Sequence, residues 1–483
     1  MTRKGRPLGS SRKTFVVDSS SSEDNDSDDE YIPSESDSGS DNNYDSDEEN
    51  IIFDEMRDDS RLDYGKQAKV IVLEHKLFEL FRHCNSCVGY NKIEKRTKGT
   101  LLVVQTTCQL CWKQSSWQNQ DFIAGKPVLN ILISAMILLT GNWPTKSIRL
   151  FKLLNIAIHS TRSFFRYQQN FFHGAINWVW EVSRKTILDG LNGERLLGGD
   201  GRCDSMGHSA KFWSYSIMDI KAKKVVSLQL VQSNEVKNSN AMELEGLKRC
   251  TTELGNIPVK AFISDMHLQI GKWIRTVWKV SHYYDCWHVV KSITKKLEKL
   301  AKTKAFVDIQ DWVKSLKYHL YWCVSSSPKD DKESIKKKWL SAVEHVQGVH
   351  VNCTPAGDKI EEVLKGTRLV NKVTKMSPYG QTSQLECLHS VFNHFAPKML
   401  QFSYRGLLSR LHIAALHFNE NSSRMQKLKK DGTGRVSLIY PKYKKRHVLR
   451  FLLNDATYDY VNDCLNEIIG DIKKKQHTKK KYC

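Results

Sequence analysis

The chain has 483 residues, of which 40% are hydrophobic, so it is long enough for several domains with buried cores. Its formal net charge is +21, but residues 1–17 carry +5 and residues 18–63 carry −17, which leaves +33 on residues 64–483. A body this basic suits a polyanionic partner, and nucleic acid is the usual one. The longest apolar run, residues 128–139, is shorter than the ~20 residues that cross a bilayer, which argues against a membrane protein.

The first 63 residues combine a basic arm with an acidic segment. Within residues 1–17, the run that contains Lys4 and Arg6 is similar to an AT-hook, which inserts arginine into the minor groove of A·T-rich DNA. A nuclear-import signal explains the same residues equally well, and either function implies a nuclear protein. Residues 18–63 have few large apolar side chains, so we expect them to be disordered. An inert solubilising tail is favoured over a DNA mimic or an autoinhibitory segment.

Two pairs of cysteines follow, within residues 76–120. Cys84-x2-Cys87 and Cys108-x2-Cys111 are separated by 20 residues, a spacing typical of a tetrahedral Zn²⁺ site with four thiolate ligands. The apolar residues between the pairs indicate a strand, as in a zinc ribbon. Because all four positions are filled by protein ligands, the metal is predicted to be structural. Four buried free cysteines would leave the paired spacing unexplained.

Residues 125–190 have the apolar spacing of helices. Ser160 or Thr161 is suited to cap a helix that presents Arg162 and Arg166 to solvent. A helix, a turn and a capped helix with outward arginines are typical of a helix-turn-helix DNA reader. A purely structural three-helix unit fits the same pattern.

From about residue 195 to residue 285, short apolar runs alternate with turns. Three strand-like segments are followed by a helix, a fourth strand, a second helix and a fifth strand, which is the order of the ribonuclease H-like fold. We therefore predict an α+β protein with a ribonuclease H-like core over 195–420. A lysine-rich helical insertion is expected at about 289–375, and a basic tail at 421–483.

Three acids lie where such a core would bring them together. Asp200 lies in the first strand, Asp265 ends the fourth, and Glu386 lies in a later helical pattern. Phosphodiester transfer uses two Mg²⁺ or Mn²⁺ ions about 3.5–4 Å apart, and these ions prefer oxygen ligands such as carboxylates. Asp204 competes with Asp200, because it lies four residues further along the same strand. For any one acid alone, a solvated or helix-capping role is the simpler interpretation.

The segments around these acids resemble eukaryotic cut-and-paste transposases with a D…D…E triad, which include the Kolobok, Mutator-like and hAT groups and their host-genome relatives. Gly199-Asp200-Gly201 is similar to the first-acid segment and Ile263-Ser264-Asp265-Met266-His267 to the second. Asp285-Cys286-Trp287-His288 is similar to the [C/D]-x2-H motif of those families, and Ser383 to Ser390 to the glutamate helix. The similarity covers about 80–420.

The resemblance implies three catalytic metal ligands, Asp200, Asp265 and Glu386. It also implies that Asp285 and His288 shape the active site or the DNA ends. His267 and His389 lie close to the acids in sequence and are expected to contact phosphate. DNA is the implied partner, and identical chains are expected to assemble on DNA ends.

Two hypotheses follow from different classes of function. The first is an active transposase that cleaves DNA at element ends and joins the freed 3′-hydroxyl to target DNA; a related nuclease is a variant of it. The second is a host-adopted DNA-binding or chromatin protein that keeps the fold without catalysis, because a fold and its ligands do not guarantee an activity.

Overall fold

The computed structural model describes residues 64–205, 210–347, 355–442 and 445–481. The predictions for the basic arm, with Lys4 and Arg6, and for the acidic segment 18–63 lie outside the described residues. Within the described part of the chain, none of the helices combines the length and the apolar character that a bilayer span requires.

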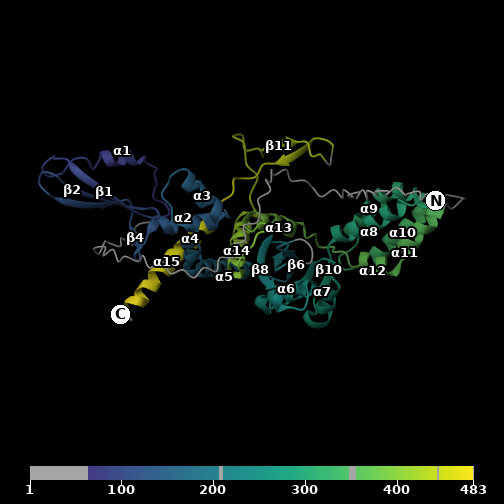
Figure 1. Ribbon diagram of the computed structural model, residues 1–483. Coiled ribbons are helices and arrows are strands. Elements are labelled where there is room, and N and C mark those ends of the chain that lie inside the picture. Colours follow the sequence, from purple (N-terminus) through teal and green to yellow (C-terminus); the bar gives the residue numbers. More distant parts are fainter. Residues whose placement is uncertain (1–63, 206–209, 348–354, 443–444, 482–483) are drawn as a thin grey trace, which may run out of the picture. The chain divides into compact units, whose positions relative to one another are not determined.

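The cysteine-containing region forms a three-stranded antiparallel sheet in the order β1-β2-β3 (Figure 1). Its elements are α1 (Glu74–Glu79), β1 (Asn91–Lys98), β2 (Leu101–Cys108) and β3 (Gln114–Gln118), followed by the small hairpin β4 (Phe122–Ile123) and β5 (Lys126–Pro127). Lys98 pairs with Leu101, so only Gly99 and Thr100 connect β1 to β2. Gly99 has a φ of +61°, the left-handed conformation that such a tight turn requires. Sequence reasoning predicted the strand at β2 and missed the strands on either side of it.

The helical region begins as predicted. It consists of α2 (Val128–Leu139), α3 (Pro144–Leu153), α4 (Thr161–Tyr167), the π-helical turn η1 (Gln168–Phe172) and α5 (His173–Gly190). Ser160 caps α4, because its hydroxyl accepts a hydrogen bond from the Ser163 backbone N–H. Arg162 and Arg166 are exposed on α4, as expected. The helix does not end there: α4 continues through η1 into α5.

A five-stranded mixed sheet lies at the centre of the chain, in the order β10-β9-β6-β7-β8. Its elements are β6 (Arg195–Cys203), β7 (Phe212–Asp219), β8 (Lys224–Gln232), η3 (Ser233–Glu235), α6 (Ser239–Leu254), β9 (Val259–Ser264), α7 (Leu268–Trp273), the π turn η4 (Ile274–Trp278) and β10 (Ser281–Tyr284). The predicted order of strands and helices over 195–285 is therefore confirmed. β6 is the middle strand, antiparallel to β7 and parallel to β9.

The two faces of the sheet are covered by different helices (Figure 1). Tyr215 and Ile217 pack with residues of α6 and α7, whereas Met218 packs with the helices that follow the insertion. This division follows from the alternation of side chains along a strand. Gly246 of α6 allows a close approach to the sheet, since a Cβ there would lie 2.6 Å from the Cβ of Tyr215.

The predicted insertion is helical and has its own apolar core. Its elements are α8 (Cys286–Ala301), η5 (Lys304–Phe306), α9 (Ile309–Ser325), α10 (Lys332–Gln347), α11 (Pro355–Lys365) and α12 (Thr367–Val373). Trp339 is fully buried in this core, and its indole N–H donates to the Leu364 carbonyl at 3.1 Å. The aromatic residues of the insertion are thus partly structural.

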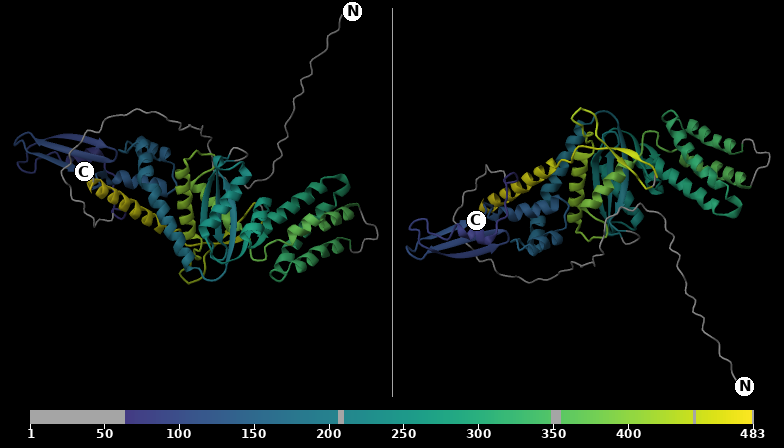
Figure 2. Two further views of the ribbon diagram at one scale, coloured as in Figure 1. Left: turned by 90° about the horizontal axis from the view of Figure 1, so that it is seen from below. Right: turned by 90° about the horizontal axis from the view of Figure 1, so that it is seen from above.

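The segment predicted as a basic C-terminal tail is instead largely structured. After α13 (Ser383–Phe395) and α14 (Tyr404–Asn421), the chain forms the hairpin β11 (Val436–Ile439) and β12 (Val448–Phe451) and the helix α15 (Asp459–Lys481). Tyr460, Leu465 and Ile468 of α15 are buried in the largest apolar cluster, which also contains residues of α2, α5 and α14. Figure 2 shows α15, in yellow, beside α5, in blue. The helical region and the sheet therefore share one core.

Candidate functional site

The four predicted zinc ligands lie together at one end of the ribbon sheet. The Sγ atoms of Cys84, Cys87, Cys108 and Cys111 all lie within 4.8 Å of one another. Backbone N–H groups of Leu110 and Cys111 point to the Cys108 thiol at 3.4 Å. These hydrogen bonds, of which that from Cys111 has the largest effect, lower the pKa of the Cys108 thiol to about 6. A lowered pKa favours the thiolate form, which is the form that binds metals.

The ribbon backbone also leaves room for an ion. Gly89 lies against the cluster, where a Cβ would be 3.4 Å from the sulfurs of both Cys87 and Cys108 and 2.9 Å from the Cβ of Leu110. The arrangement could hold a metal such as zinc. It is the one group of three or more metal-ligating side chains that converges this closely within the described residues.

Removal of the metal is expected to unfold the ribbon, because a four-thiolate site couples binding to folding. Chelation of the full-length protein should remove the hydrogen-exchange protection of the amides in β1 to β3 and leave the amides of β6 and β9 protected. Cys87→Ser should have the same effect, and Cys203→Ser, outside the cluster, should not. Unchanged protection of β2 after metal removal would contradict a structural metal here.

Asp200 and Asp265 lie at the same end of adjacent parallel strands. The last registered pair between β6 and β9 is Gly198 with Ile263, and each aspartate lies two residues beyond it. Extending the register places both aspartates at the same edge of the paired region of the two strands, and the charge of Asp265 contributes to the raised pKa of Asp200. Two of the three predicted metal ligands are therefore brought together by the sheet itself.

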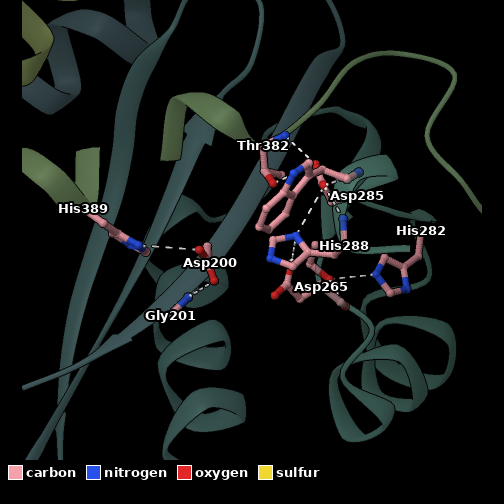
Figure 3. A network of polar contacts seen from close by, with 10 residues as sticks. Asp200, Gly201, Asp265, His282, Asp285, His288, Thr382 and His389 are labelled. Carbon is pink, nitrogen blue, oxygen red and sulfur yellow. Dashed lines mark hydrogen bonds and ion pairs between the residues drawn. The ribbon is translucent and has the colours of Figure 1, made fainter. Parts of the chain in front are cut away.

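Asp200 faces the helix that carries Glu386. Alternate residues of a strand share a face, and a Cβ on Gly198 would lie 3.5 Å from the Thr382 methyl, just before α13. From α13, the Nδ1 atom of His389 lies 3.6 Å from the Asp200 carboxylate, which also accepts a hydrogen bond from the Gly201 N–H at 2.7 Å (Figure 3). Burial and the nearby charge of Asp265 raise the pKa of Asp200 to about 7.

His288 joins Asp265 to Asp285. Its Nδ1 atom lies 2.9 Å from the Asp265 carboxylate and 3.3 Å from that of Asp285 (Figure 3). Burial disfavours the charged ring, but the hydrogen bonds to Asp265 and then Asp285 outweigh burial and raise the pKa of His288 to about 10. His288 is therefore a cation between two carboxylates at neutral pH and orients Asp265.

Asp285 accepts hydrogen bonds both from the start of α8 and from Thr382, directly before α13. One carboxylate oxygen accepts from the backbone N–H groups of Trp287 and His288, and the other accepts from the N–H and the hydroxyl of Thr382 at 2.7 and 2.8 Å. Burial opposes ionisation, but the hydrogen bond from the His288 ring, followed by those from Thr382 and the His288 N–H, lowers the pKa of Asp285 to about 2. Its predicted role in shaping the site is consistent with this position.

Glu386 is exposed and makes no hydrogen bond or ion pair with any residue that the structure describes. It lies four residues after Thr382, which bonds Asp285, and three before His389, which contacts Asp200. Residues at these spacings share a helix face. Glu386 thus shares the face of α13 that carries His389, the residue that contacts Asp200.

The other predicted residues are less central. The His267 Nδ1 atom accepts from the Ile270 N–H at 3.3 Å and caps α7, and its Nε2 atom lies 4.0 Å from the carboxylate of Glu243. Asp204, the competitor of Asp200, accepts a hydrogen bond from the Lys211 backbone N–H at 3.1 Å.

Sequence reasoning missed Glu243 and Tyr215. Burial and the charge of Asp265 raise the pKa of Glu243, on α6, to about 7. The Tyr215 hydroxyl is fully buried and has no hydrogen-bond partner among the described residues, and a Cβ on Gly199 would lie 2.8 Å from it. Burial, followed by the charges of Glu243 and Asp200, raises the pKa of Tyr215 well above its usual value. No local pattern marks either residue, because both are placed by packing between α6 and the sheet.

No protein-family model matches the chain, and no curated protein matches it.

Proposed function

We propose that this protein is a metal-dependent DNA strand-cleaving and strand-joining enzyme of the transposase type, built on a ribonuclease H-like core. The observation that carries the proposal is that Asp200 and Asp265 each lie two residues beyond the last registered pair of the parallel strands β6 and β9, and that His389 of α13 contacts Asp200. The central position of β6, antiparallel to β7 and parallel to β9, supports the proposed fold.

The residues fit a divalent cation. Carboxylate oxygens are the ligands that Mg²⁺ prefers, and Asp200, Asp265 and Glu386 would hold it. Burial, followed by the negative charge of Asp265, raises the pKa values of Asp200 and Glu243, and a cation would relieve that crowded charge. The Nε2 atom of His389, which has no hydrogen-bond partner in the part of the chain that the structure describes, is a further buried polar group at this site. When bound, the metal would activate a water molecule or a 3′-hydroxyl and stabilise charge on the phosphate.

The protein's own groups have separate tasks in this proposal. His288 holds the Asp265 carboxylate at 2.9 Å, and Asp285 holds both His288 and the start of α13. The positive charge of residues 64–483 attracts the DNA backbone. Exposed Arg162 and Arg166 on α4 offer a second DNA contact, as in a helix-turn-helix reader.

Strand cleavage by the purified full-length protein tests the proposal. Supercoiled plasmid should be nicked with Mg²⁺ or Mn²⁺ and left intact with EDTA, and Asp265→Asn should abolish nicking while DNA affinity is kept. A protein that binds DNA but never cleaves it, and whose binding is unaffected by Asp265→Asn, would overturn the enzymatic proposal.

The alternative is a DNA-binding protein without catalysis. One observation favours it: among the described residues, only the four cysteines converge within 4.8 Å as metal-ligating groups, so the carboxylates lie further apart. The same nicking assay separates the two, because this alternative predicts DNA binding without metal-dependent cleavage.

A further inference from the structure

One face of α8 is a row of exposed side chains that starts beside the candidate site. Val289, Val290 and Ile293 are buried against the insertion core on the opposite face. The exposed row consists of Trp287, Lys291, Lys295 and Lys299 at four-residue intervals. We call the three lysines the lysine track; none of them forms an ion pair with a residue in the described ranges. Glu298 is the single acid within α8.

The row is continuous with the site through Trp287. Its ring meets that of His288 edge-on, with centroids 4.7 Å apart, and His288 contacts Asp265. The Lys291 ammonium group lies 4.1 Å from the centre of the Trp287 ring. Trp287 is nevertheless 39% exposed, so part of its indole surface is open to a further flat group.

The spacing and the kinds of side chain in the row indicate which class of partner it would bind. Lysines four residues apart advance about 6 Å along a helix, and one strand of B-DNA advances about 3.4 Å per nucleotide. Successive lysines are thus spaced to reach roughly every second phosphate. An acidic peptide would satisfy the lysines alone, whereas a nucleic-acid strand offers both phosphates for the lysines and a base for the indole.

We propose that α8 guides a DNA strand to the acid site, with the lysine track on backbone phosphates and Trp287 stacked on a base beside the scissile phosphodiester. The proposal deepens the proposed function and rests on it for the position of the reacting phosphate. It predicts that removing these side chains weakens binding of DNA with a free single strand more than comparable changes elsewhere in the insertion do.

Salt titration of DNA binding tests the lysine track in the full-length protein. The variant K291Q/K295Q/K299Q should reduce the slope of log affinity against log salt by about 2 for single-stranded DNA, since each phosphate contact contributes about 0.7. The matched control is K314Q/K317Q/K337Q, three exposed lysines of α9 and α10. Its slope should stay within error of the unaltered protein. Equal losses in the two variants would overturn the track, because they would show a non-specific charge effect.

Trp287 has a matched control of its own. Trp322 on α9 is 49% exposed and lies under Lys338 at 5.3 Å, but it is not part of the row. Trp287→Ala should lower affinity for single-stranded DNA roughly 10-fold, and Trp322→Ala should not. Circular dichroism establishes that each variant is folded, and equal affinities for the two would overturn the stacking role.

Different experimental results would overturn this proposal and the proposed function. Metal-dependent nicking together with unchanged salt slopes in the track variant would overturn the path along α8 and leave the enzymatic proposal intact. A reduced slope in a protein that never nicks DNA would support the DNA path and overturn the enzyme. Displacement of DNA from the track by poly-glutamate at equal charge concentration would identify an acidic-peptide surface and overturn the proposal.

Discussion

Replacing Asp285 with alanine is expected to lower the free energy of unfolding by about 3–5 kcal/mol, the usual cost of removing one partner from a buried charged network. Only 2% of the Asp285 side chain is exposed, and its two oxygens accept five hydrogen bonds: two from backbone N–H groups of α8, one from the His288 ring and two from Thr382. Alanine leaves these donors buried without an acceptor and leaves His288 with Asp265 as its single carboxylate partner. Urea denaturation followed by circular dichroism measures the loss.

Thr382→Val is the matched control for this prediction. Valine keeps the shape of the side chain and the backbone N–H bond to Asp285, and it removes only the hydroxyl bond at 2.8 Å. A hydrogen bond to a charged group contributes about 1.5–3 kcal/mol, so the loss should be smaller than in Asp285→Ala. Equal midpoints for the two variants would contradict the role of Asp285 as the junction between α8 and α13.

The stabilisation by Asp285 should also depend on pH. The pKa of Asp285 is about 2 in the folded protein, below the usual value of 3.8. A carboxylate with a lowered pKa stabilises the fold fully above its unfolded pKa and loses that effect as the pH falls through the folded pKa. The difference between the unaltered protein and Asp285→Ala should therefore be constant above about pH 5 and shrink between pH 4 and pH 2.

The order of strands and helices could be predicted because it follows from local patterns of apolar and polar residues. Alternation along residues 212–219 and 224–232 and the acid after the fourth strand are visible without knowledge of the partners. β1 was missed because its sequence, Asn-Lys-Ile-Glu-Lys-Arg-Thr-Lys, has one large apolar residue and is mostly exposed. Its pairing with β2, rather than a hydrophobic pattern, makes it a strand.

The C-terminal helix was not predicted, because the many charged residues of its sequence indicated a solvated segment. The lysines of residues 473–481 suggested a solvated tail, whereas Tyr460, Cys464, Ile468 and Ile472 form a buried stripe at four-residue spacing. That spacing is visible in the sequence and predicts an amphipathic helix.

The candidate site was only partly accessible from sequence. Asp200 follows from its place in the first strand, Asp265 from its place directly after the fourth, and the four cysteines from their spacing. Glu243 could not be found in this way, because α6 also carries Glu245 and Glu253 and nothing local separates the three. Its relation to Asp265 arises from the packing of α6 against the sheet, which the close approach at Gly246 permits.

Glu386→Gln is expected to lower strand cleavage by at least about 10²-fold, the scale for loss of one charged or hydrogen-bonding group that acts in the transition state. Glutamine has nearly the same shape, and Glu386 is exposed without a partner among the described residues, so the fold should not change. A ligand role further predicts weaker Mn²⁺ binding, measured by calorimetry or electron paramagnetic resonance in the absence of DNA.

Glu243→Gln distinguishes the two candidates for the third carboxylate. Glu386 lies on the α13 side of the sheet, which Asp200 faces, whereas Glu243 lies on α6, which packs on the other side. Glu243→Gln should therefore reduce Mn²⁺ affinity and cleavage less than Glu386→Gln, because it removes a nearby charge rather than a ligand. If Glu243→Gln loses both metal binding and cleavage while Glu386→Gln keeps them, the third ligand comes from α6, and the resemblance of α13 to the glutamate helix does not extend to its chemistry.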